Sequence, residues 1–221
     1  MYEAIRDLRK NTGINNMSEF IKGIDRSIPY YNLILKCNEI CTRPVSLPEG
    51  YSFKLYDVGD EKYWAKLEYE IGDFSSVEEA EMYFKTNYCN QFDELKKRCV
   101  FVVDAYDDFV GSCIAWHDLK GNDTVASLHW LVVSPEHQGK HIGLALCQKV
   151  MNIFNERNET PIYIHTQPWS YKAILLYIKL GFKIQKTETF SHYENQYKKA
   201  IKTLENLLSE SQFNQIILSS E

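Results

Sequence analysis

The fold of this chain is decided by one stretch, Val133-Ser-Pro-Glu-His-Gln-Gly-Lys-His-Ile-Gly-Leu-Ala145. The stretch joins an apolar segment, Leu128 to Val133, to a segment whose apolar residues recur at helical spacing. Gly139 and Gly143 lie in the turn between them. The first N–H groups of a helix have no intrahelical partner, and the helix dipole adds partial positive charge there. We therefore predict a strand, a turn and a helix start that together bind a phosphate or pyrophosphate.

Two common phosphate loops do not fit this turn. The chain has no Gly-x4-Gly-Lys-Ser/Thr run, which excludes a Walker loop. The dinucleotide fingerprint needs Gly-x-Gly-x-x-Gly, whereas three residues separate Gly139 from Gly143.

The turn resembles the pyrophosphate loop of the GCN5-related N-acetyltransferase (GNAT) superfamily, Gln/Arg-x-x-Gly-x-Gly/Ala. Gln138-Gly-Lys-His141-Ile-Gly143 occupies these positions, with His141 in place of the inner glycine. A residue in the first turn of a helix needs no positive φ, so we expect a side chain to be tolerated at His141, beside the phosphates.

A second segment, Pro168 to Phe182, resembles the Asn-x-x-Ala-x-x-x-Tyr-x-x-x-Gly-Phe signature of the same family. Ser170, Ala173 and Tyr177 recur at spacings that place them on one helix face. Gly181 is expected to end this helix. Ser170 replaces the usual asparagine, so its shorter hydroxyl either keeps the coenzyme hydrogen bond or leaves it absent.

The resemblance covers roughly Tyr51 to Ile184 and implies the α/β fold of the acyl-CoA N-acyltransferases. That fold has a central mixed, mostly antiparallel sheet with one splayed parallel pair and helices on both faces. The coenzyme enters the splay, here between strands that end near Val133 and Thr166.

Three parts of the chain are predicted. Residues 1–50 form an N-terminal extension with helical stretches at Tyr2–Lys10 and Met17–Lys22 and a strand within Ile28–Lys36. Residues 51–190 form the acetyltransferase domain, and residues 191–221 a C-terminal helix, Ser191 to Ser209, and a tail. The expected domain strands are 51–56, 98–106, 109–116, 124–133, 162–166 and one from 182; its expected helices are two within 57–94, one at about 140–157 and the Tyr177 helix.

Composition excludes several classes of protein. The chain is 44% hydrophobic and 25% charged, as in ordinary globular domains. Its net charge of −5 argues against a nucleic-acid binder. The sequence has no run of about 18 apolar residues, so we expect no membrane span. The N-terminus has no apolar core typical of a signal peptide. The six cysteines show no metal-ligand or disulfide spacing, so we expect reduced thiols, no metal and a cytoplasmic location.

The resemblance implies transfer of an acetyl group from acetyl-CoA to a primary amine, on a small molecule or a peptide, by direct attack on the thioester. Tyr177 would be the general acid for the thiolate, unless it is a core aromatic. The residues expected to bind the coenzyme are Leu131, Val133, Gln138, Gly139, Lys140, His141, Ile142, Gly143, Ser170, Ala173 and Tyr177.

His129 is the candidate general base. By the period of two it should share a strand face with Ser127, Leu131 and Val133. A histidine suits proton transfer at neutral pH. The competing interpretation is a strand histidine with satisfied hydrogen bonds.

The acceptor pocket should be walled by the helices of residues 57–94, which hold eleven acids against Lys62, Lys66 and Lys85. An acidic wall would favour a cationic amine, although a solvated helix face explains the same charges. Four aromatics, Tyr30, Tyr31, Trp64 and Phe74, either line this pocket or pack in the core.

Two alternatives from other classes stay open. One is an acyl-CoA-binding regulatory module without catalysis, which the departures at His141 and Ser170 keep open, whereas Tyr177 favours the enzyme. The other is an interaction protein whose C-terminal helix and N-terminal extension form a homodimer. It is compatible with either of the first two.

Overall fold

The computed structural model describes residues 25, 27–42 and 44–221. The helical stretches predicted within residues 1–24 lie outside the described residues.

Seven strands of the described residues form one sheet in the order β2-β3-β4-β5-β6-β1-β7. Every neighbouring pair is antiparallel except β5 and β6. The predicted mixed, mostly antiparallel sheet with one parallel pair is therefore confirmed. The strands are β1 (Leu33–Cys37), β2 (Ser52–Leu55), β3 (Cys99–Val103), β4 (Phe109–Lys120), β5 (Asp123–Val133), β6 (Ile162–Thr166) and β7 (Lys183–Ile184).

The strand of the predicted N-terminal extension, β1, is an inner strand of the sheet. It starts at Leu33, later than the predicted Ile28, and pairs with β6 on one side and β7 on the other. Leu33, Ile34 and Leu35 are completely buried because both faces of the strand are covered. β1 therefore supports β6 along the whole length of that strand, from Leu33 opposite Thr166 to Cys37 opposite Ile162.

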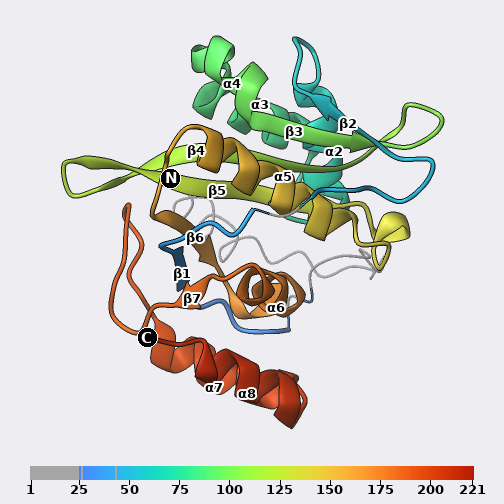
Figure 1. Ribbon diagram of the computed structural model, residues 1–221. Helices are drawn as coiled ribbons and strands as arrows, with labels where there is room; N and C mark the ends of the chain where they lie inside the picture. The colour runs from blue at the N-terminus through green and yellow to red at the C-terminus, as the bar shows by residue number, and fades with distance from the viewer. Residues whose placement is uncertain (1–24, 26, 43) are drawn as a thin grey trace.

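Helices cover both faces of the sheet, as predicted (Figure 1). α5 (Ile142–Glu156) and α6 (Tyr171–Lys179) bury residues such as Leu146 and Ile174 in the larger hydrophobic core. α2 (Glu61–Glu70), α3 (Val77–Asn87) and α4 (Phe92–Arg98) bury Trp64, Phe84 and Leu95 in a second core on the opposite face. In Figure 1, α5 crosses the near side of β4 and β5, and α2 lies behind them.

The segment 57–94 holds one more helix than predicted, because a 3-10 turn at Cys89–Gln91 separates α3 from α4. Ser76 caps α3, since its Oγ accepts a hydrogen bond from the Glu79 N–H at 3.1 Å. The Glu79 carboxylate accepts from the N–H of Ser75 at 2.9 Å. Asp60 precedes α2 but makes no side-chain cap.

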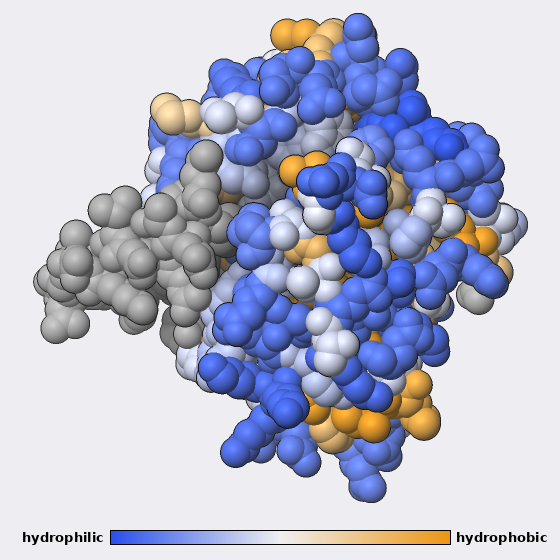
Figure 2. Space-filling model, turned by 90° about the vertical axis from the view of Figure 1, so that its left-hand side faces the viewer, coloured by the Kyte–Doolittle hydropathy of each residue, from blue (hydrophilic) through white to orange (hydrophobic). Residues whose placement is uncertain are grey.

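The C-terminal segment differs from the single predicted helix of 191–209. α7 (Tyr197–Leu207) starts later, and α8 (Glu210–Leu218) follows a Ser209 capping box. The last residues return to the sheet, where the Ile184 N–H donates to the Ser219 carbonyl at 2.7 Å. Figure 2 shows hydrophobic residues gathered at the lower end of the molecule, where α7 and α8 lie in Figure 1.

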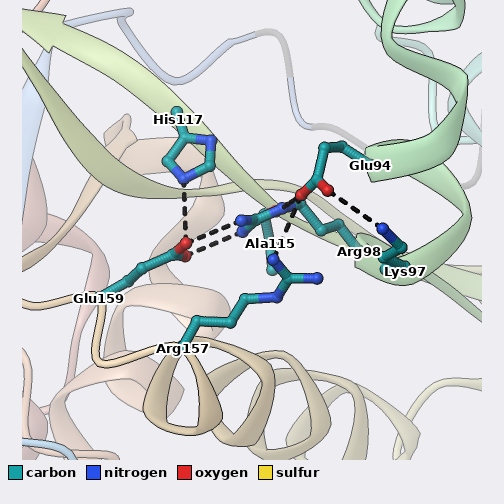
Figure 3. A network of polar contacts seen from close by, with 7 residues as sticks. All are labelled: Glu94, Lys97, Arg98, Ala115, His117, Arg157 and Glu159. Carbon is teal, nitrogen blue, oxygen red and sulfur yellow. Dashed lines mark hydrogen bonds and ion pairs between the residues drawn. The ribbon is translucent and has the colours of Figure 1, made fainter.

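A buried arginine ties α4 to the loop between α5 and β6 (Figure 3). Arg98, 3% exposed, donates two hydrogen bonds to the Glu159 carboxylate, at 2.7 and 2.8 Å, and a third to Glu94 at 2.8 Å. The Arg98 contact lowers the pKa of Glu94 to about 2. This network holds the loop that leads from α5 into β6 against the α2–α4 side of the sheet.

No helix in the described ranges has the length and apolar character needed to cross a membrane. Within the same ranges, no three His, Cys, Asp or Glu side chains are grouped to hold a metal ion.

Candidate active site

The parallel strands β5 and β6 pair over a very short length. Only Ala126 with Ile162 and Ser127 with Tyr163 are in register. Both strands continue beyond this point, to Val133 and Thr166, without facing each other. The backbone groups on the inner edges of the two strands therefore border an opening, at the place where the coenzyme was expected.

A β-bulge in β5 sets the directions of the side chains at this opening. Ser112 pairs with Val132 and Ile114 with His129, so Trp130 and Leu131 together face the single residue between Ser112 and Ile114. Trp130 has a φ of 52°, which is rare for a bulky residue. The bulge inserts one residue into the alternation.

The prediction that His129 shares a face with Leu131 and Val133 is consequently wrong. Leu131 and Val133 pack on the α5 core, whereas His129 contacts Tyr88 of the α2–α3 core. A period of two holds only within an unbroken strand, and the bulge shifts the residues that follow it.

A cavity of about 200 Å³ lies at the opening of the two strands. Its walls come from β5 and β6, from the start of α6 and from the end of α2. Since α2 and α6 pack on opposite faces of the sheet, the cavity passes through the thickness of the sheet. The lining residues are Tyr30, Glu68, Ile71, Asp73, Tyr83, Asp118, Ser127, Leu128, His129, Trp130, Leu131, Ile164, His165, Thr166, Gln167, Trp169, Ser170, Ala173, Tyr177, Phe190 and Tyr193.

Four of the predicted coenzyme residues line this cavity: Leu131, Ser170, Ala173 and Tyr177. The turn residues from Gln138 to Gly143 do not line it and lie past the end of β5. A Cβ on Gly143 would lie 3.7 Å from both Leu176 of α6 and Val133 of β5. The structure thus brings the turn and the Tyr177 helix together, although they are far apart in sequence.

The turn itself is held by side chains as well as by its backbone. Gln138 Nε2 donates to the Val133 carbonyl at 3.0 Å. Lys140 Nζ donates to the Tyr51 hydroxyl at 3.0 Å, and that hydroxyl also contacts His137 Nδ1 at 2.9 Å. Lys140 therefore contacts Tyr51, the residue before β2, and lies beside the start of α5.

His141 does not lie in the first turn of α5, as was expected, but caps it in the left-handed conformation, with φ of 63°. The expectation that this position needs no positive φ is wrong. Glycine adopts such a φ without a steric cost, which explains why the family's pattern has a glycine at this position. The N–H groups of residues 141–144 have no acceptor within the helix and remain able to bind an anion.

Ser170 and Tyr177 differ in how they present their hydroxyls. Ser170, at the N-cap of α6, accepts a hydrogen bond from Gln167 Nε2 at 3.0 Å. Tyr177 is 5% exposed, and burial raises the pKa of its phenol well above the usual value. Its phenol therefore keeps its proton at neutral pH, in the wall of the cavity.

The two ring nitrogens of His129 both have partners. Trp130 Nε1 donates to the Tyr88 hydroxyl at 2.8 Å, so this hydroxyl is free to donate to His129 Nδ1, also at 2.8 Å. His129 Nε2 then carries the proton and faces an Asp118 oxygen at 3.4 Å. Burial would raise the pKa of Asp118, but the contact with His129 outweighs it and the pKa is lowered. Asp118 is therefore a carboxylate beside the imidazole.

Several cavity residues were not predicted from the sequence. His165 stacks on Tyr193, with ring centroids 3.6 Å apart, and its Nε2 lies 3.0 Å from Asn32 Oδ1. Burial lowers the pKa of His165 to about 3, which keeps the imidazole neutral. Asp73, Asp118 and Tyr193 reach the cavity only through tertiary packing, and no local pattern marks them.

Glu68 was also missed as a site residue, although the sequence holds a signal for it. It follows Trp64 by four residues and precedes Ile71 by three, so it falls on the apolar face of α2. An ionisable residue on such a face stands out from a solvated helix face. Of the four aromatics that were considered for the pocket, Tyr30 lines the cavity, while Tyr31, Trp64 and Phe74 pack in the cores.

Comparison with known proteins agrees with this geometry. The model of the acetyltransferase (GNAT) family matches residues 62–182. No curated protein sequence matches the chain. A GCN5-related N-acetyltransferase from Sphaerobacter thermophilus has the same fold, with a TM-score of 0.54 and 16% identity over 83% of this chain and 53% of its own. This chain thus spans about half the length of that protein.

A glucosamine-6-phosphate N-acetyltransferase from Arabidopsis thaliana also matches, with a TM-score of 0.49 and 14% identity over 66% of this chain and 99% of its own. The family match extends from α2 to Phe182 and includes both the turn before α5 and the Tyr177 helix. The chain therefore belongs to the acetyltransferase (GNAT) family.

Proposed function

We propose that this protein transfers the acetyl group of acetyl-CoA to a primary amine of a small molecule or peptide. The observation that carries the proposal is the cavity between the parted ends of β5 and β6, with Tyr177 in its wall and the turn 138–143 beside it. An anion-binding helix start and a cavity that crosses the sheet suit a long phosphate-bearing donor and a separate acceptor.

In this proposal the donor lies along the parted end of β5. The N–H groups of the turn, from Gln138 to Gly143, bind the pyrophosphate, with Lys140 nearby. The backbone of Val133 and Leu131 guides the pantetheine, and Ser170 and Ala173 border the thioester end. The hydroxyl of Ser170 already accepts from Gln167, so its bond to the coenzyme would use its own proton.

The amine attacks the acetyl carbon directly. A C–N bond forms, the C–S bond breaks, and its electron pair goes to sulfur. Tyr177 is the proposed acid, and its phenol holds a proton until negative charge develops on the leaving sulfur. Holding both reactants in one small cavity removes the entropic cost of bringing them together.

His129 remains the proposed base within the Asp118–His129–Tyr88 series. Asp118 would stabilise the imidazolium that forms when His129 takes a proton. Because Nδ1 already accepts from Tyr88, this step requires the Tyr88 hydroxyl to give up that hydrogen bond. The same contacts support a second role, in which His129 only positions the cavity wall.

The second candidate function is an acyl-CoA-binding module without catalysis. Two observations favour it: His141 in a left-handed conformation within the turn, and the Ser170 hydroxyl engaged by Gln167. A cytoplasmic location is part of both proposals. A homodimer through α7 and α8 would use the exposed Leu207, Ile217 and Leu218, and light scattering that shows a monomer would exclude it.

Thiol release from acetyl-CoA, measured over a panel of amines, tests the proposed function. Calorimetry with acetyl-CoA measures donor binding in the same preparation. Amine-dependent thiol release supports the transferase. Coenzyme binding without turnover on any amine supports the module.

A further inference from the structure

Glu68 is a buried carboxylate that the donor side of the site does not use. It is 1% exposed, and among the described residues its Oε1 has no hydrogen-bond partner. The side chain lines the cavity. Burying a carboxyl without a partner costs several kcal/mol as an order of magnitude, so such a group in a native protein calls for an explanation.

The surroundings of Glu68 are acidic. Asp73 and Asp118 also line the cavity, and none of the lining residues from the described part of the chain is a lysine or arginine. The charge of Asp118 is maintained by His129, and His165 is neutral. The charge of Asp118 therefore gives the cavity a negative potential that attracts a cation.

The remaining walls suit a cation as well. Tyr83 and Trp130 face the cavity on the α2 side, where their rings contact each other with centroids 5.3 Å apart. Aromatic faces attract ammonium groups and pack against alkyl chains. The volume of about 200 Å³ accommodates only a slim ligand.

The position of Glu68 relative to Tyr177 assigns it to the acceptor. Glu68 comes from α2 and Tyr177 from α6, on opposite faces of the sheet, and both reach the cavity at the opening of β5 and β6. Tyr177 lies on the donor side, with Ser170 and Ala173. Glu68 reaches the cavity from the other face of the sheet, on which the proposed donor does not lie.

We infer that Glu68, assisted by Asp73, binds the ammonium group of the acceptor and accepts its first proton, so that the substrate is a slim, cationic primary amine. This inference rests on the proposed acetyl transfer. Peptide and amino-acid acceptors whose carboxylates lie close to the amine are disfavoured by the same acidic wall.

The proton balance follows from this assignment. The ammonium gives one proton to the Glu68 carboxylate, and the free amine then attacks the acetyl carbon. His129, the proposed base, takes the second proton as the adduct collapses to the amide. Tyr177 gives its proton to the leaving thiolate and recovers one when His129 releases its own. In sum, one proton is carried away on the thiol of CoA and one is released to solvent from Glu68. Burial and the charge of Asp73 raise the pKa of Glu68, and an ammonium group bound beside it favours the charged carboxylate, which brings the pKa values of the two groups closer together.

The test compares two small, slim primary amines that differ in charge, and each variant is judged by its loss relative to the unmodified protein on the same amine. Butylamine is an ammonium ion at neutral pH, whereas methoxyamine is neutral and needs neither an ion partner nor prior deprotonation. We expect Glu68→Gln to lower kcat/KM for butylamine about 100-fold or more, and to change kcat/KM for methoxyamine only a few-fold. Acetyl-CoA affinity should stay the same.

Glu70→Gln is the matched control, because it removes the same charge from the exposed side of the same helix. It should leave both amines unaffected. Asp73→Asn gives a second readout and should lower turnover of butylamine more than that of methoxyamine. Thermal unfolding of each variant verifies that it is folded. The ranking of butylamine above glycine by the unmodified protein tests the charge preference without any substitution.

The two proposals fail in different ways. Equal losses for butylamine and methoxyamine in folded Glu68→Gln, or a preference of the unmodified protein for glycine over butylamine, would overturn the role of Glu68 and leave acetyl transfer standing. No thiol release by the unmodified protein with any amine, methoxyamine included, would overturn acetyl transfer itself.

Discussion

Glu68 of α2 and Tyr177 of α6 line the same cavity, although their helices pack on opposite faces of the sheet. This is possible because β5 and β6 share only two register pairs before they part. A complete parallel ladder would seal the sheet and separate the two side chains. The short pairing therefore opens one cavity to side chains from both faces of the sheet.

Removal of the Tyr177 hydroxyl should slow the chemical step and spare coenzyme binding. The Tyr177 and Phe182 ring centroids lie 6.0 Å apart in the unmodified protein. Tyr177→Phe retains the ring and can keep this packing. We expect kcat to fall by about 100-fold, with acetyl-CoA affinity nearly unchanged. Steady-state kinetics and calorimetry measure the two quantities, and full activity would remove Tyr177 from the mechanism.

Replacement of His129 should alter the pH–rate profile if His129 is the base. A histidine base is active when neutral, so the rate of the unmodified protein rises with pH on the acid side. His129→Ala should lose this rise together with part of kcat. A profile of unchanged shape would restrict His129 to positioning the cavity wall through Tyr88 and Asp118.

The left-handed conformation of His141 predicts opposite results for two substitutions. His141→Gly relieves the steric cost of a φ of 63° and keeps the backbone N–H groups. It should therefore bind acetyl-CoA at least as tightly as the unmodified protein. His141→Val should weaken binding and lower the free energy of unfolding by about 1–2 kcal/mol. Calorimetry and denaturant unfolding measure both, and tight binding by the valine variant would contradict the argument.

The Arg98 network predicts a large loss of stability on truncation (Figure 3). Arg98→Met leaves the Glu159 carboxylate, 22% exposed, without its bidentate partner. We expect the free energy of unfolding to fall by about 2–3 kcal/mol, less than for a fully buried pair because water reaches Glu159. Lys97→Met, at an exposed neighbour, should change it by less than about 0.5 kcal/mol.

The same network predicts how stability depends on pH. The folded-state pKa of Glu94 is lowered to about 2, from a usual value of 4.5, and that of Glu159 is lowered as well. A lowered carboxyl pKa contributes stability above the unfolded value, and this contribution is lost as pH falls toward the folded value. The difference between the unmodified protein and Arg98→Met should therefore shrink from pH 7 to pH 3. Urea unfolding at the two pH values measures it, and a constant difference would contradict the role of these carboxylates.

Local patterns predicted the elements around the turn 138–143 well. β6 matches the predicted 162–166, and α5 lies within two residues of the predicted 140–157 at its start and one at its end. Strands and amphipathic helices of this length are specified by short-range periodicity. The prediction of a single C-terminal helix was wrong, because Ser209 forms a capping box that starts a second helix, although the apolar spacing continues through it.

The cavity-lining residues of α6 were singled out from the sequence, whereas those from α2 and β4 were not. Ser170, Ala173 and Tyr177 belong to one helix, so their spacing is visible in the sequence. The predicted face of His129 was wrong because of the bulge at Trp130. This bulge depends on pairing with β4, which the sequence of β5 alone does not reveal. Asp118, at the other end of the same hairpin, reaches the cavity through that pairing.

By itself the sequence determined the order of the elements, the family and the residues of each single helix or turn, because these depend on neighbours within a few positions. It also showed eleven acids in residues 57–94 without indicating their places. Only the tertiary structure decided that Glu68 and Asp73, of these eleven, enter the cavity. It also decided that β1 enters the sheet beside β6. Both outcomes follow from packing between segments far apart in the chain, which no local periodicity encodes.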